Sequence, residues 1–242
     1  MFSAIATALL VASMSFAQTS RSDFDGDGSV GFPDFLLFAE AFAAENTPPV
    51  SSASYLVTFT STWSESTHPI DFPQFGLASY SPLVGGTHTE DVVFWAGGEP
   101  ASPGIKDMAE TGQTGTLGGE VSAAINAGTA GAVLVANTKL DPTPGMTTMT
   151  FDIDENHPLV TLVTMIAPSS DWFVGVAGVN LFEGGEWVDE VSFELPPWDA
   201  GRDSGSTYGS EDSRTTPPDV IRAIAGSPLG SASVGTFTFT RQ

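Results

Sequence analysis

The stretch VTLVTMIAPSSDWFVGVAGV, residues 160–179, decides the fold class of this chain. It consists of two apolar runs, Val160–Ala167 and Trp172–Val179, which are separated by a short turn of Pro, Ser and Asp residues. Short apolar runs rich in Val and aromatic residues, bounded by turn residues, are typical of strands buried on both faces. We therefore expect two central strands of a β scaffold here.

Other segments of the chain alternate in part between apolar and polar residues, as half-buried strands do. They are Tyr55–Thr60, Thr148–Ile153 and Gly235–Thr240. Short strands separated by Gly and Pro favour an antiparallel sandwich or barrel, so the expected fold class is all-β. Two further segments, Val121–Ala127 and Asp219–Ala225, are expected to form short helices.

Composition limits the kinds of partner that the protein can have. The chain has 242 residues, of which 41% are hydrophobic, enough for a substantial core. Its 29 acidic and 7 basic residues give a net charge of −22, which disfavours nucleic acid and anionic lipid surfaces. Calcium or a basic partner fits better. Since the chain has no cysteine, we expect bound metal to contribute stability that disulfides supply in other exported proteins.

The order of segments predicts an exported protein. The apolar run Ala4–Phe16 leads to a small-x-small cleavage site at Ala17 and has the pattern of a secretory signal. No later apolar stretch is long enough for a transmembrane helix, so we expect a secreted or cell-surface protein. The expected division is a signal peptide at 1–17, a calcium loop and helix at 18–45, a linker at 46–52 and the β domain at 53–242.

The segment Asp23–Asp34 matches a twelve-residue EF-hand calcium loop. The candidate ligands are Asp23, Asp25 and Asp27 at positions 1, 3 and 5, the Ser29 carbonyl at position 7 and Asp34 at position 12, with Gly28 at position 6 for the turn. An Asp at position 12 resembles the repeat of dockerins, which carry two such repeats where this chain has one. The alternative is a linker rich in Asp and Gly.

The segment Phe35–Glu45, which follows the loop, is predicted to be a helix that is apolar on most of its faces. Such a helix is expected either to pack on the β domain or to contact a partner, and the sequence leaves both open.

An ordered series of motifs connects the β domain to a known family. The motifs are Trp63-Ser64, His68-Pro69, Phe72-Pro73, Ser81–His88, Trp95–Gly98, Ala101–Gly104, His157–Val160, Met165–Gly175 and Trp198–Gly205. From about Ala53 onward the chain resembles the N-terminal domain of spondins. The resemblance implies an eight-stranded antiparallel β-sandwich of the calcium- and phospholipid-binding type. It also implies an adhesive role in the extracellular matrix and a calcium ion at one end, held by aspartates that carry over onto Asp171, Asp199 and Asp203.

The chemistry of these three residues allows a hard cation. Asp199 and Asp203 lie four residues apart on a predicted turn, and Asp171 lies in the turn directly before the predicted strand Trp172–Val179. Ligand sets made only of oxygen favour calcium over zinc or copper. The alternative is that they are turn-forming aspartates that bond their own backbone. A zinc site at His68, His88 and His157 is disfavoured, because these residues lie in separate segments without ligand spacing.

The predicted function is a secreted, non-catalytic, calcium-binding domain for adhesion or recognition. Its ligand would be an unidentified extracellular protein or glycan. The sequence contains no Gly-x-Ser-x-Gly elbow, no thiol and no phosphate-binding loop. Two alternatives remain open, namely a carbohydrate-active or other hydrolase tethered through the dockerin-like segment, and a structural component of a surface layer or biofilm.

Overall fold

The computed structural model of the protein describes residues 22–46, 50–74 and 76–242. The expected signal peptide at 1–17, and residues 47–49 of the expected linker, lie outside these ranges. The chain divides into two compact units, Met1–Pro49 and Val50–Gln242. We call the described parts of these the front unit and the sandwich unit, and each is described by itself.

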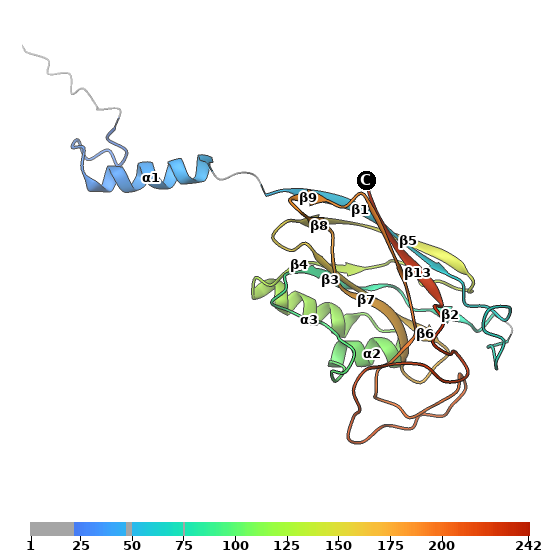
Figure 1. Cartoon of the computed structure of the whole chain (residues 1–242). Coiled ribbons are helices and arrows are strands. Elements are labelled where there is room, and N and C mark those ends of the chain that lie inside the picture. The colour runs from blue at the N-terminus through green and yellow to red at the C-terminus, as the bar shows by residue number, and fades with distance from the viewer. Residues whose placement is uncertain (1–21, 47–49, 75) are drawn as a thin grey trace, which may run out of the picture. The chain divides into compact units, whose positions relative to one another are not determined.

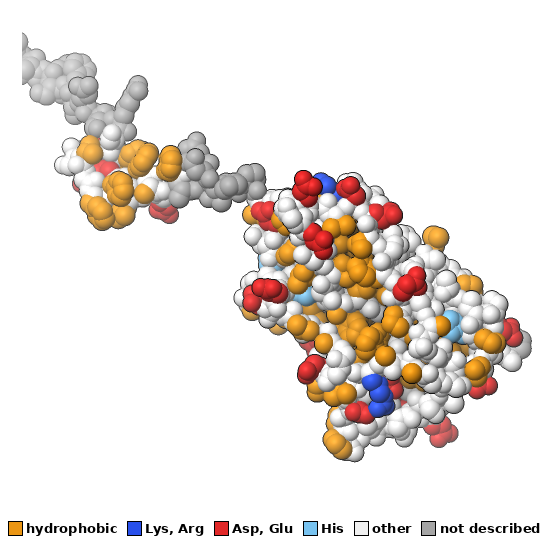
Figure 2. Space-filling view, in the orientation of Figure 1, with side chains coloured by type: hydrophobic (Ala, Val, Ile, Leu, Met, Phe, Trp, Pro, Cys, Tyr) orange, Lys and Arg blue, Asp and Glu red, His pale blue; other side chains and the backbone are white. Residues whose placement is uncertain are grey.

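The front unit consists of a loop followed by helix α1 (Phe32–Asn46). The helix begins three residues before the expected start, because Pro33 and Asp34 suit the first turn of a helix. Ring contacts join Phe38 to Phe24 and to Phe42, at 5.8 and 5.7 Å between centroids. Figure 2 shows hydrophobic side chains on the surface of this unit. The exposed large side chains are Phe24, Val30, Phe32, Phe35, Leu36, Leu37, Phe38 and Phe42.

Two antiparallel sheets build the sandwich unit (Figure 1). The first contains, in spatial order, β10 (Glu190–Glu194), β13 (Gly235–Arg241), β1 (Ser52–Ser61) and β5 (Gly145–Asp154). The second contains β12 (Arg222–Ala223), β11 (Trp198–Asp199), β7 (Trp172–Asn180), β6 (Leu159–Ala167), β3 (Val84–His88) and β4 (Ala130–Val135), with β2 (Ser79–Tyr80) beside β6. Strands β8 (Phe182–Glu183) and β9 (Glu186–Trp187) form a separate ribbon. The expected all-β sandwich is confirmed.

The main core lies between the two sheets. Along β1, inward side chains such as Tyr55, Val57 and Phe59 are buried and alternate with half-buried ones, which is the period of two that a sheet face imposes. The three expected half-buried strands are confirmed as β1, β5 and β13. Trp63, directly after β1, is fully buried against Phe72 and other aromatic rings. Large aromatic side chains of this kind supply much of the apolar area that stabilises a fold without disulfides.

A second apolar layer covers the outer face of the sheet that contains β6 and β7. Figure 1 shows helices α2 (Pro103–Thr111) and α3 (Gly115–Asn126) lying over this face. Their buried side chains, among them Ile105, Met108 and Leu117, pack with Val163 and Phe173 of the sheet. Strands β6 and β7 therefore have core on both sides, and their expected burial on both faces is confirmed.

Two helix predictions have different outcomes. Val121–Ala127 overlaps the C-terminal half of α3, which begins earlier, at Gly115. The helix predicted at Asp219–Ala225 is wrong, since this segment contains β12, which pairs with β11. Its backbone groups bond across the fold, with the Asp219 N–H donating to the Gly201 carbonyl at 2.8 Å. Helix α2, which was not expected, begins at a Ser102 cap whose hydroxyl accepts the Ile105 N–H at 3.1 Å.

Candidate metal centre

The turn between β6 and β7 places Asp171 at one end of the sandwich unit. Ser169 fixes this turn, because its hydroxyl donates to the Ile166 carbonyl at 2.6 Å and accepts the Trp172 N–H at 3.0 Å. Strand β11 pairs with the start of β7, and the Ala200 N–H donates to the Asp171 carbonyl at 3.1 Å. The sheet therefore brings Asp199 beside Asp171 although they are distant in sequence.

The segment after β11 wraps around the Asp171 side chain. The Oδ2 atom of Asp171 accepts backbone N–H groups from Arg202 at 2.7 Å and from Asp203 at 3.0 Å. The wrap requires Gly201, which has a φ of 71° and where a Cβ would lie 2.5 Å from the Asp219 carbonyl oxygen. The three predicted aspartates therefore lie at the same end of the fold.

Asp199 and Asp203 are held by backbone N–H groups of the surrounding turns. The Oδ1 atom of Asp199 accepts the Gly201 N–H at 2.8 Å. Asp203 is 6% exposed and accepts N–H groups from Gly205 at 2.7 Å and from Ser213 at 2.6 Å. Bonds of this kind are those expected of turn-forming aspartates, and each carboxylate oxygen keeps a further lone pair for another ligand.

Burial makes the negative charge of Asp171 costly. The side chain is fully buried, and its loss of hydration raises the pKa of the carboxyl from 3.8 to about 6. The N–H groups of Arg202 and Asp203 oppose this rise, whereas the charges of Asp199 and Asp203 add to it. A cation at this point would relieve both the desolvation and the repulsion between carboxylates.

Two buried oxygen atoms at this end have no hydrogen-bond partner among the described residues: Oδ1 of Asp171 and Oγ of Ser170. Buried polar atoms are nearly always paired, so such a pair of oxygens is unusual. A Cβ on Gly205 would overlap the Ser170 hydroxyl and lie 2.9 Å from Oδ1 of Asp203. The oxygens of Ser170 and Asp203 thus face the same glycine. A donor set made only of oxygen fits a hard cation such as calcium.

Sequence reasoning missed Ser170 and Arg222 at this end. Ser170 had a signal, because it directly precedes Asp171 in the turn, but nothing local indicates that its hydroxyl is buried without a partner. Arg222 had none, since only the pairing of β12 with β11 brings its guanidinium to 3.5 Å from Asp199. Its second ion pair, with Asp219 at 2.5 Å, is local in sequence. A cavity of about 230 Å³, lined in part by Asp199, Gly205 and Arg222, lies beside these residues.

The front unit contains the tighter cluster of acids. Asp23, Asp25 and Asp27 each offer an oxygen within 4.8 Å of the others. Within the described ranges no other set of three acidic or histidine side chains comes this close, and Asp171, Asp199 and Asp203 do not. The Asp23 carboxylate accepts N–H groups from Gly26 at 2.8 Å and from Gly28 at 3.1 Å, which holds the loop closed around its first ligand position.

Asp34 and Ser29 occupy the remaining predicted positions of this loop. Asp34 is 3% exposed, and its carboxylate accepts N–H groups from Gly31 at 2.7 Å, Phe24 at 2.6 Å and Asp25 at 3.2 Å. The bond from Gly31 contributes most to lowering the pKa of Asp34. The Ser29 N–H donates to Asp27 at 2.8 Å. Asp34 thus ties the two ends of the loop together.

The three histidines lie in separate environments. Nδ1 of His88 lies 2.7 Å from the Thr89 carbonyl oxygen, and its Nε2 lies 2.8 Å from the Thr161 hydroxyl. His157 contacts Asp154 at 3.1 Å, and His68 contacts the Thr67 hydroxyl at 3.0 Å. The structure does not bring these side chains together.

The fold and the site define a class: a two-sheet antiparallel sandwich with helices on one outer face and, at one end, the buried Asp171 and Asp203 with the half-buried Asp199. The Spondin_N family model matches residues 53–235 of this chain. The chain belongs to the family of spondin N-terminal domains.

Three relatives illustrate the extent of the match. Spondin-2 of Rattus norvegicus is 36% identical over 176 residues, and spondin-2 of Homo sapiens is 35% identical over 176 residues. In each case the match covers 72% of this chain and 53% of the relative. Spondin-1 of Mus musculus is 36% identical over 183 residues, which are 72% of this chain and 22% of the relative. This chain therefore spans about half the length of spondin-2 and less of spondin-1.

Family membership also bears on where the protein acts. Spondins are secreted proteins of the extracellular matrix, and membership places this chain with them, as the sequence predicted. Over the described residues, no helix is both long and apolar enough to cross a membrane.

Proposed function

We propose that the sandwich unit is a non-catalytic recognition domain whose end loops are fixed by a calcium ion at Asp171, Asp199 and Asp203. The observation that carries the proposal is the buried Oδ1 of Asp171, an acidic oxygen without a hydrogen-bond partner among the described residues. Leaving a charged oxygen buried and unpaired costs free energy that a bound cation would recover. The Ser170 hydroxyl, which is also buried and has no hydrogen-bond partner in the described part of the chain, would be a further ligand of the same ion.

The proposed role of calcium is mechanical. The candidate ligands come from two segments, the β6–β7 turn and the stretch 199–205. Pairing of β11 with β7 and the N–H groups of Arg202 and Asp203, which donate to the Asp171 side chain, join these segments. A bound ion would place positive charge between the two segments, and oxygen atoms from both segments would coordinate it. Because it would bind the folded chain and not the unfolded one, it would stabilise the sandwich unit, which has no disulfide.

Relatives support a recognition role. The named relatives are spondins, and the family consists of matrix and adhesion proteins rather than enzymes. We propose an extracellular protein or a glycan as the ligand of this chain.

We propose that the front unit binds a second calcium ion through Asp23, Asp25, Asp27, the Ser29 carbonyl and Asp34. Support comes from the spacing of the first three carboxylates, within 4.8 Å of one another. The bond from the Gly28 N–H to Asp23 is the contact between positions 6 and 1 that a closed calcium loop needs.

The two sites can be tested separately by counting ions and by melting. Native mass spectrometry should find two calcium ions per chain, one in an Asp199→Ala/Asp203→Ala variant and one in an Asp23→Ala/Asp25→Ala variant. Chelation should lower the melting temperature of the unaltered protein and should have little effect on the Asp199→Ala/Asp203→Ala variant. Equal melting of the unaltered protein with and without chelator would reject the calcium role in the sandwich unit.

A further inference from the structure

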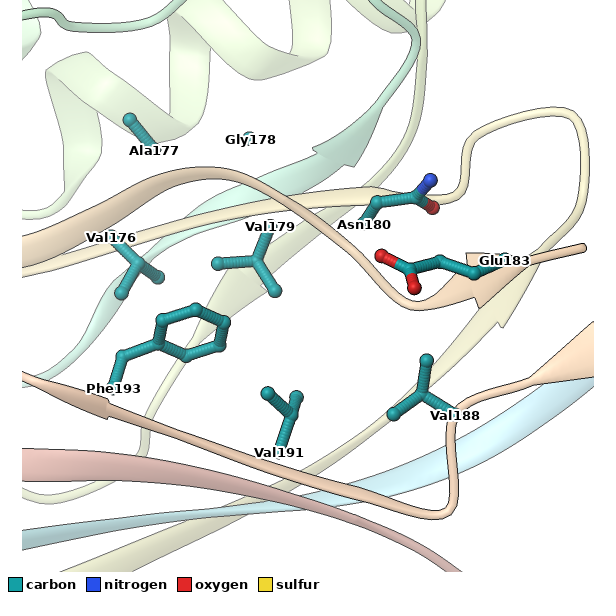
Figure 3. A pocket seen from close by; sticks show the side chains of 9 residues that line it. All are labelled: Val176, Ala177, Gly178, Val179, Asn180, Glu183, Val188, Val191 and Phe193. Carbon is teal, nitrogen blue, oxygen red and sulfur yellow. The ribbon is translucent and has the colours of Figure 1, made fainter.

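A groove opens between the two sheets at the side of the sandwich unit where β7 faces β10. It has a volume of about 430 Å³, and Figure 3 shows the side chains that line it. Val176 and Val179 of β7 lie opposite Val191 and Phe193 of β10, and Glu183 lies at one end of the groove. Apolar side chains thus line its length, and a carboxylate marks its end.

The groove is open because both strands beside it lack a neighbour there. Strand β11 pairs with β7 only at Trp172 and Phe173, so the stretch 176–180 has β6 on one side and no described strand on the other. Strand β10 is the outermost strand of its own sheet, and of the strands that the structure describes it pairs with β13 alone. Unpaired strand edges carry free backbone groups that can pair with another chain.

The register of β10 shows which of its backbone groups are free. The Arg241 N–H donates to the Asp189 carbonyl at 2.8 Å, and the Leu195 N–H donates to the Gly235 carbonyl at 2.9 Å. In an antiparallel pair every second residue exchanges hydrogen bonds with its partner strand. These two bonds and the β10–β13 register therefore direct the N–H and C=O groups of Val191 and Phe193 toward β13. The backbone N–H and C=O groups of Glu190, Ser192 and Glu194 therefore point away from the sheet.

The charge of this edge indicates which kind of chain can pair with it. The side chains of Glu190, Ser192 and Glu194 are exposed. Glu183, Glu190 and Glu194 form no ion pair with any described Lys, Arg or His side chain. Antiparallel pairing of β10 with a second copy, centred on Ser192, would set Glu190 against Glu194 of the other copy. Like charges directly opposite destabilise a strand pair, so a basic partner is favoured over a second copy.

We propose that the β10 edge binds an extended segment of a partner protein as an added strand, one in which apolar side chains alternate with Lys or Arg. The apolar side chains would enter the groove against Val176, Val179 and Val191. The basic side chains would lie on the outer face beside Glu190 and Glu194. Main-chain hydrogen bonds would give affinity and the two sets of side chains would give specificity, as in other cases of strand addition.

This proposal does not depend on the calcium site. Asp171 precedes the first residue of β7, whereas the groove begins at Val176 and extends past the other end of the strand. Binding at the groove should therefore be the same in calcium and in chelator, which separates its failure from a failure of the calcium proposal.

The test uses fluorescence anisotropy with the full chain and a capped peptide of alternating Lys and Val, about seven residues long. Two controls are a Glu-Val peptide of the same length and a Lys-Val peptide with the order scrambled. We expect the alternating Lys-Val peptide to bind at least about tenfold more tightly than either control. A Glu190→Lys/Glu194→Lys variant should prefer the Glu-Val peptide instead.

Altered peptides separate strand addition from simple charge attraction without changing the protein. Residues that lie opposite each other in two paired strands have their side chains on the same face of the sheet. The Lys residues would therefore lie opposite Glu190, Ser192 and Glu194, and their backbone N–H groups would donate to the carbonyls of these residues. N-methylation of the Lys residues should abolish binding, whereas N-methylation of the Val residues should leave it nearly unchanged. Equal binding of the two methylated peptides, or of the scrambled peptide and the alternating one, would overturn the proposal.

Discussion

Replacement of Asp171 by Asn tests the electrostatic account of the metal centre most directly. The substitution keeps the size of the side chain and an oxygen that can accept the Arg202 and Asp203 N–H groups, and it removes the charge. Two effects of opposite sign are expected. Without calcium the variant should be more stable than the unaltered protein at neutral pH, and with calcium it should lose the stabilisation that the ion provides.

The magnitude follows from the pKa of Asp171. Burial raises this pKa from 3.8 to about 6, and each pKa unit corresponds to about 1.4 kcal/mol, so the ionised form costs up to about 3 kcal/mol. As pH rises, the unfolded chain loses this proton first, and the calcium-free fold therefore loses stability between about pH 4 and pH 6. Above about pH 6 the cost is fully present. In a unit of this size, about 3 kcal/mol corresponds to a melting difference of about 6–12 °C.

Scanning calorimetry at pH 4 and pH 7, with calcium and with chelator, measures both effects. In chelator, the advantage of the Asp171→Asn variant should be present at pH 7 and nearly absent at pH 4. The matched control is Asp152→Asn, which removes an exposed charge on β5 and should show no such dependence. An Asp171→Asn variant that melts below the unaltered protein at pH 7 in chelator would refute the argument, as would an advantage of equal size at both pH values.

Three further predictions concern the scaffold and the front unit. Gly85→Ala should destabilise the sandwich unit by more than about 2 kcal/mol in urea unfolding, because the added Cβ overlaps the Thr161 carbonyl in a central strand pair. Gly119→Ala, in a helical position with no atom within 4 Å of the added Cβ, should instead be neutral or stabilising. Trp63→Ala should lower the free energy of unfolding by about 3–5 kcal/mol in the same assay, since the side chain is fully buried among Phe72, Tyr80 and Tyr208. A loss of much less stability would contradict the place of Trp63 in the core. Asp34→Ala should speed hydrogen exchange at the amides of Phe24, Asp25 and Gly31, which donate to this carboxylate, and should leave the melting of the sandwich unit unchanged. Unchanged exchange at these amides would show that Asp34 does not close the loop.

The strands were predictable where local composition reports burial. Val160–Ala167 and Trp172–Val179 contain no charged residues, and short runs of this composition are typical of strands with core on both faces. The helices that provide the second core were harder to predict. Helix α2 has a mixed composition, and it is held by contacts from outside its own sequence, such as the Glu120 carboxylate, which accepts the Gly104 N–H at 2.7 Å.

The error at Asp219–Ala225 has a similar cause. Pro217 and Pro218 before an apolar stretch suit the start of a helix, and a helix would satisfy the backbone within the segment. In the fold the same groups bond elsewhere: the Ile221 N–H donates to the Glu99 carbonyl at 2.8 Å, and Arg222 pairs with Asp199 across β12 and β11. Partners that are distant in sequence override a weak local preference.

The amino-acid sequence by itself determined the class of fold, the family and the positions of the aspartates, because apolar periodicity and ordered motifs are local properties of the chain. Only the tertiary structure decided what surrounds these aspartates. Three features arise where separate segments meet: the burial of Asp171, its N–H donors from Arg202 and Asp203, and the Ser170 hydroxyl that no described group bonds. Solvation and hydrogen bonding depend on neighbours in space, so the cost of the Asp171 charge is set by packing that no single segment encodes.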